Sequence, residues 1–121
     1  MATITATEFN TLMDLSTSDL PLATGETIID LAVDLLNNFS GADIPNMSGT
    51  AASKTWSGTS KEKGAIHLAA RAIYYGFFRG VSNLSISGIS LSVADVLGNA
   101  TVMETIKQVA GNLREMDVSL G

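Results

Sequence analysis

The residue types with the most chemical potential lie in one stretch, KEKGAIHLAARAIYYGFFRG, at residues 61–80. Cationic and aromatic side chains recur there at every fourth position: Lys63, His67, Arg71, Tyr75 and Arg79. His67 is the only histidine, and the sequence lacks the H-x-x-x-H and H-E-x-x-H spacings of helical metal sites. The stretch therefore indicates a helix that packs and binds rather than one that catalyses.

A second set of chemically active residues is acidic. Glu26, Asp30 and Asp34 repeat every four residues, and we call them the acidic ladder. On a helix this spacing places like charges side by side, which costs a few tenths of a kcal/mol per adjacent pair. Glu26 is favoured by the positive end of the helix dipole, whereas Asp34 is too far along the helix to benefit. The acidic ladder has three interpretations: a solvated face, a surface for a cationic partner, or a divalent cation site.

The usual signatures of enzymes are missing from the sequence. It contains no Cys, so a thiol nucleophile and a thiolate metal site are excluded. No G-x-S-x-G elbow occurs, and GTAASKTWSG has a Lys-Thr pair without the spacing of a phosphate-binding loop. We expect a protein that is not an enzyme and that requires neither a metal nor a cofactor.

The charge is low and unevenly distributed. Charged residues make up 16% of the chain, whereas about a quarter is typical, and this favours a protein that buries part of its surface in an assembly. Residues 1–53 hold seven acidic residues and no basic one, whereas residues 54–81 hold five basic residues and one acidic residue. The two regions can pair within one chain or between copies. No secretory charge pattern and no apolar run of membrane-spanning length occurs, so we expect a soluble protein without a membrane partner.

Capping signals and apolar spacing predict four helices, at residues 5–15, 25–39, 60–79 and 101–116. Gly41 follows the second helix at the position of a left-handed cap. Three of the helices open with Thr-x-x-Glu capping boxes: Thr5–Glu8, Thr59–Glu62 and Thr101–Glu104. The predicted core contains Leu31, Leu35, Ile66, Ile73, Ile106 and Leu113. The predicted fold is mainly α, a small bundle of about four helices in a single domain spanning residues 1–121.

Two connections and the C-terminal tail do not fit this helical pattern. Residues 42–59 are polar, so we expect them to be mobile in an isolated subunit and ordered by a neighbour. Their candidate anchors are Ile44, Met47 and Trp56. Residues 84–93 alternate apolar residues with Ser, which predicts a short hairpin or an extended arm. The tail REMDVSLG alternates apolar residues beyond the last helix and predicts a docking segment formed by Met116, Val118 and Leu120.

The helix at residues 60–79 is predicted to be core on one side and interface on the other. Its aromatic residues lie beside Arg71 and Arg79, and these residue types are enriched at interface cores. We expect Asp30 and Asp34 of one subunit to face Arg71 or Arg79 of the next. The alternative is that the two helices simply pair inside one fold.

The order of these segments resembles the head–tail connector (adaptor) proteins of long-tailed phages and related archaeal viruses. In that family an Ala-rich helix ending in an aromatic residue and Arg is followed by a segment S-x-S-x-G-x-x-S-x-S. The present chain has a shorter S-x-S-G-x-S-x-S version formed by Ser85, Ser87, Gly88, Ser90 and Ser92. It departs from the family in the long 42–59 insert and in lacking the usual acidic residue after the Gly.

The resemblance implies a structural protein of the virion neck, assembled in the host cytoplasm. Such proteins form a ring, typically twelve-fold, that joins the portal protein to the next neck or tail protein and continues the DNA channel. In the family, C-terminal segments commonly reach the portal, which would make Met116, Val118 and Leu120 the portal-docking residues. A net charge of −5 suits a channel through which DNA slides without tight binding.

Two other functions compete with this one. The first is a small helical regulatory module that binds one protein partner. The second is a DNA-binding helix-turn-helix protein, for which the last helix offers Lys107, Gln108, Asn112 and Arg114 as the reading residues.

Overall fold

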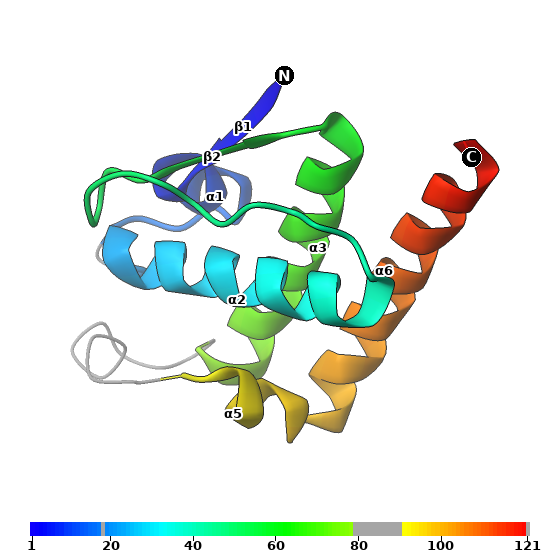
Figure 1. The fold of residues 1–121 in the computed structure, drawn as a ribbon. Coiled ribbons are helices and arrows are strands. Elements are labelled where there is room, and N and C mark those ends of the chain that lie inside the picture. Colours follow the sequence, from blue (N-terminus) through cyan, green and yellow to red (C-terminus); the bar gives the residue numbers. More distant parts are fainter. Residues whose placement is uncertain (18, 79–90, 121) are drawn as a thin grey trace.

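Three helices pack against one another at the centre of the fold: α2 (Leu22–Ser40), α3 (Ser60–Phe77) and α6 (Ala100–Leu120) (Figure 1). The computed structural model describes residues 1–17, 19–78 and 91–120, with the backbone alone for residues 114–120. α2 lies across α3, and α6 runs beside them and ends away from the body. The fold is mainly α, as the sequence predicts.

Local sequence signals account for the limits of α2 and α3. α2 ends at Gly41, whose φ of 74° is the left-handed conformation that the sequence predicts for a glycine cap. α3 opens with the predicted capping box: the Thr59 hydroxyl accepts the Glu62 N–H at 3.1 Å, and the Glu62 carboxylate accepts the Thr59 N–H at 2.9 Å. The end of α2 and the start of α3 therefore follow from nearby residues alone. The start of α2 does not: the helix begins at Leu22, three residues before the predicted position 25, after Pro21 and without a side-chain cap.

α1 (Ala6–Leu12) is shorter than the predicted helix at residues 5–15. Thr5 caps it as expected, accepting the Glu8 N–H at 3.1 Å. The helix stops because Asp14 adopts a left-handed φ of 58°, which turns the chain away. The Glu8 carboxylate forms an ion pair with Lys63, so it links α1 to α3.

The last part of the chain differs from the prediction in two ways. A short helix, α5 (Val93–Leu97), begins with a Ser92–Asp95 capping box that the sequence analysis missed. The predicted Thr101–Glu104 box is wrong, because Asn99 caps α6 by accepting the Val102 N–H at 3.1 Å. The predicted hairpin at residues 84–93 lies outside the described residues up to residue 90, and from Val93 the chain is helical.

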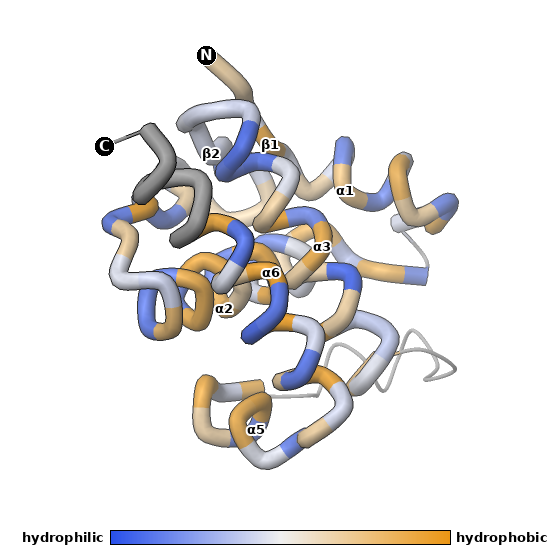
Figure 2. The backbone as a smooth tube through the Cα atoms, turned by 90° about the vertical axis from the view of Figure 1, so that its right-hand side faces the viewer, coloured by the Kyte–Doolittle hydropathy of each residue, from blue (hydrophilic) through white to orange (hydrophobic). Residues whose placement is uncertain are grey.

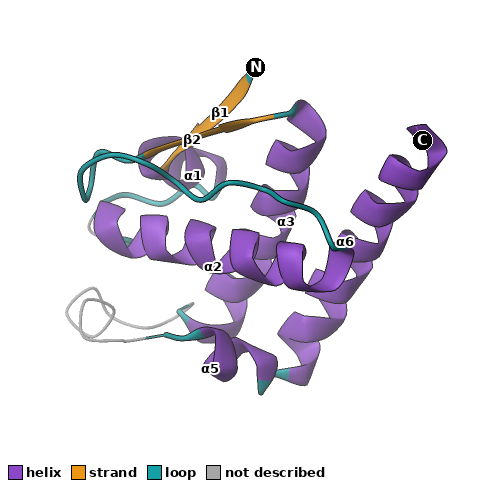
Figure 3. Ribbon diagram, in the orientation of Figure 1, coloured by secondary structure: helices purple, strands orange, loops and turns teal. Residues whose placement is uncertain are grey.

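Two short strands were not predicted. β1 (Ala2–Thr5) pairs antiparallel with β2 (Thr55–Gly58), with Ile4 opposite Trp56 (Figure 3). Both of these side chains are fully buried. The pair therefore ties the N-terminus of the chain to the segment that leads into α3.

One buried cluster joins residues from all of these elements. All six predicted core residues belong to it: Leu31, Leu35, Ile66, Ile73, Ile106 and Leu113. Hydrophobic and hydrophilic residues alternate along α6, which is seen from its own side in Figure 2. The spacing of apolar residues along α2, α3 and α6 thus identified these six core positions correctly.

Replacement of a core residue on α3 should be far more costly than replacement on its outer side. Ile73 is fully buried, whereas Leu68 is 52% exposed on the same helix. We expect Ile73→Ala to lower the free energy of unfolding by about 2–5 kcal/mol. The matched control Leu68→Ala should change it by no more than about 0.5 kcal/mol. Urea denaturation measures both, and equal losses would contradict the assigned faces.

Candidate interaction surface

The acidic ladder binds the backbone of residues 42–59. Glu26 is 3% exposed, and its two carboxylate oxygens accept the N–H groups of Ala52 and Lys54 at 2.7 and 2.8 Å. A buried carboxylate is tolerated only when its oxygens are paired, and charge-assisted bonds to N–H groups supply that pairing. Glu26 is therefore a structural anchor for this loop.

The next turns of α2 continue the same arrangement. Asp30 accepts the Met47 N–H at 2.9 Å, and Asp34 accepts from the Asn46 side chain at 3.1 Å. One turn further, Asn37 both donates to the Ile44 carbonyl at 2.9 Å and accepts its N–H at 2.8 Å. The loop thus runs back along α2, bound at successive helical turns, as the teal trace in Figure 3 shows.

The loop anchors are buried in their own subunit. Ile44, Met47 and Trp56 are 2%, 7% and 0% exposed, and the Trp56 indole N–H donates to the Pro45 carbonyl at 2.8 Å. The expectation that these residues wait for a neighbour is wrong. The low apolar content of the loop predicts mobility. It does not reveal that side chains of α2 accept hydrogen bonds from the loop backbone.

The described residues show no contact between the acidic ladder and Arg71 within one chain, and the expected contact between subunits stays a prediction. Asp30 and Asp34 bond to the loop, whereas Arg71 lies over the Tyr75 ring, with its guanidinium carbon 5.6 Å from the ring centroid. Arg79 lies outside the described residues. Within the described part of the chain, no cluster of three His, Cys, Asp or Glu residues could hold a metal ion.

The outer side of α3 exposes two large apolar side chains with an arginine between them. Leu68 and Tyr75 are 52% and 43% exposed, with Arg71 between them and Leu12 of α1, 61% exposed, beside the same groove. We call these four residues the α3 face. Leu12 is an apolar residue of an amphipathic helix, and only the end of α1 at Leu12 and the turn after it show that this side chain is exposed.

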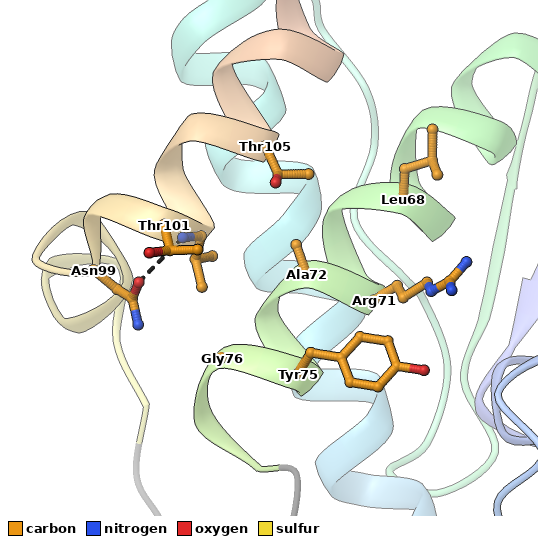
Figure 4. Close-up of a pocket in the computed structure, with 9 residues that line it drawn as sticks. Leu68, Arg71, Ala72, Tyr75, Gly76, Asn99, Thr101 and Thr105 are labelled. Atoms are coloured by element: carbon orange, nitrogen blue, oxygen red, sulfur yellow. Dashed lines mark hydrogen bonds between the residues drawn. The ribbon is translucent and has the colours of Figure 1, made fainter.

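Cavities open along both sides of the α3 face. One of about 480 Å³ lies between α3 and the start of α6, and Figure 4 shows its lining residues. Another of about 330 Å³ lies between α1 and α3. Gly76 allows the two helices to approach at the first cavity, because a Cβ there would clash with a methyl carbon of Val102. The α3 face is therefore a ridge with hollows suited to apolar side chains.

His67 lies beside this ridge, next to the cavity between α1 and α3. Its Nε2 atom is buried and has no hydrogen-bond partner among the described residues. Burial lowers the pKa of His67 below its ordinary 6.5; the Glu8 carboxylate opposes this shift, and the Lys63 ammonium adds to it. His67 is thus a neutral packing residue at neutral pH.

The remaining predicted site residues lie in the last turns of α6. The backbone is helical through Leu120, so the predicted tail is part of α6. The side chains of Met116, Val118 and Leu120 lie outside the described part, and their role in docking stays a prediction.

Comparisons of the chain with models of protein families, with curated proteins and with solved structures find no match. The resemblance to head–tail connector proteins therefore stays a prediction from the sequence. Within the described residues, no helix combines the length and the apolar character needed to cross a membrane.

Loss of the Glu26 charge should release the loop. In Glu26→Gln an amide N–H₂ group faces one of the two loop N–H groups, so we expect a loss of about 1–3 kcal/mol in the free energy of unfolding. Hydrogen exchange at Ala52 and Lys54 should become faster. The control Asp34→Asn removes a charge at an exposed position of the same helix and should leave these two amides protected. Unchanged exchange in Glu26→Gln would contradict the anchor role.

Acid should destabilise the fold through His67. The folded pKa is lowered, so the unfolded chain takes up a proton at higher pH than the folded chain does. The neutral His67 side chain therefore contributes to the stability of the fold above pH 6.5. This stability is lost as the pH falls from 6.5 through the pKa of His67 in the folded state. We expect His67→Gln to reduce the loss of stability between neutral pH and about one unit below the ordinary histidine pKa. Urea denaturation at both pH values measures this, and an equal loss in both proteins would exclude His67 as a source.

Proposed function

We propose that this chain is a structural protein of a virion neck, which forms an oligomeric ring between the portal protein and the next neck or tail component. The observation that supports this most is the α3 face. It presents Leu, Arg and Tyr side chains next to apolar hollows, and Tyr and Arg are the residue types that contribute most to binding at interfaces. A surface of this kind is suited to a protein partner.

The charge supports the same function. The net charge of −5 disfavours a tight grip on phosphates, because such binding depends on Lys and Arg. Of the basic residues that are described, Lys63 pairs with Glu8, and Lys107 lies over the Phe39 ring at 5.5 Å. A ring of such subunits would let DNA pass through its channel without binding it.

The α3 face also supports the alternative of a small helical module that binds one protein partner. The two functions differ in how many copies assemble. The helix-turn-helix function is less well supported, since Lys107 of its reading helix is held against Phe39. Its other described reading residues, Gln108 and Asn112, are exposed but uncharged.

The particle mass of the purified full-length chain separates these functions. We expect a large species of many subunits, with annular particles in electron micrographs and a portal protein as binding partner. Light scattering coupled to gel filtration measures the mass across a concentration series. A monomer or dimer at the highest soluble concentration would exclude the ring and favour the regulatory module.

A further inference from the structure

A second exposed apolar site lies at the junction of α2, α5 and α6. Leu97 at the end of α5 is 46% exposed, and it borders a hollow of about 420 Å³. We call this junction the Leu97 site, and its lining residues are Phe39, Leu97, Ala100, Met103, Glu104 and Lys107. Leu97 is a single exposed leucine beside the acidic Glu104, whereas the α3 face is a ridge that carries the basic Arg71 between two hollows.

The two surfaces lie on different sides of α6. Thr101 and Thr105 line the hollow of the α3 face, whereas Ala100 and Glu104 line the Leu97 site. Successive helical residues point about 100° apart, so these pairs face different directions. One subunit can therefore engage one neighbour through its α3 face and another through its Leu97 site.

The charges of the two surfaces are complementary. Arg71 of the α3 face and Glu104 of the Leu97 site are both exposed, and neither has an ion-pair partner among the described residues. Lys107, the other charge of the Leu97 site, lies over the Phe39 ring. An Arg–carboxylate pair across an interface fixes orientation as well as adding attraction.

We infer that the occupant of the α3 face is the Leu97 site of a second copy of this chain. Leu97 enters the hollow beside Leu68 and Tyr75, and Glu104 meets Arg71 at its rim. The contact joins two different surfaces, so a row of bound subunits always leaves one α3 face free at one end and one Leu97 site free at the other. These two free surfaces are both used only when the row closes into a ring. This inference rests on the proposed function, since it supplies the contact by which the ring forms.

Two charge insertions and their mixture test the contact. Leu68→Glu disables the α3 face, and Leu97→Glu disables the Leu97 site, both at exposed positions. Each variant alone should be monomeric. Mixed in equal amounts, they should form a dimer and nothing larger, because each intact α3 face then finds one intact Leu97 site. The control Thr27→Glu adds the same charge at an exposed position of α2 and should assemble as the unmodified chain does.

A charge exchange provides the second test and does not depend on apolar substitutions. Arg71→Glu alone and Glu104→Arg alone should each weaken assembly, whereas the double variant should recover most of it. Assembly of either leucine variant at the unmodified level, or a mixture that stays monomeric, would overturn the contact while leaving a large particle of the unmodified chain intact. An unmodified chain that is itself monomeric would overturn the ring and the contact together.

Discussion

The buried carboxylate of Glu26 is the interaction on which the arrangement of this chain depends. Its two bonds to the N–H groups of Ala52 and Lys54 lead directly into β2, which pairs with β1 and carries Trp56 into the core. α3 begins two residues after β2, so its start is positioned by the same contact. Burial of the Glu26 charge without a partner would cost several kcal/mol. The loop must therefore be bound to Glu26 whenever the core is folded.

The sequence predicted those parts of the fold that have local causes. The capping box of α3 and the glycine that ends α2 each depend on residues within one turn, and both were correct. The β1–β2 pair joins residues fifty or more positions apart, and strands of four residues rich in Thr and Ser have no pattern of their own. The start of α6 was misplaced because Asn99 and Thr101 are both good caps, and spacing alone does not choose between them.

The candidate site was predicted in part, for a related reason. The exposure of Arg71 and Tyr75 follows from their positions on an amphipathic helix. Asp30 was assigned to a cationic partner because a sequence displays side-chain charges and not the backbone N–H groups that a carboxylate can equally bind. Leu12 and Leu97 had no such signal, since each lies at the end of a short helix whose length is set by the turn that follows.

The binding of the acidic ladder to the loop also changes which charges are left for partners. Glu26, Asp30 and Asp34 are directed to groups of the same chain, and Glu8 and Lys63 neutralise each other. The remaining surface keeps a net negative charge, so two copies repel each other in most orientations. An exposed cation beside apolar surface offsets this repulsion, and the α3 face with Arg71 is such a place among the described residues. Because the acidic ladder is used internally, its carboxylates do not compete for Arg71 at the α3 face.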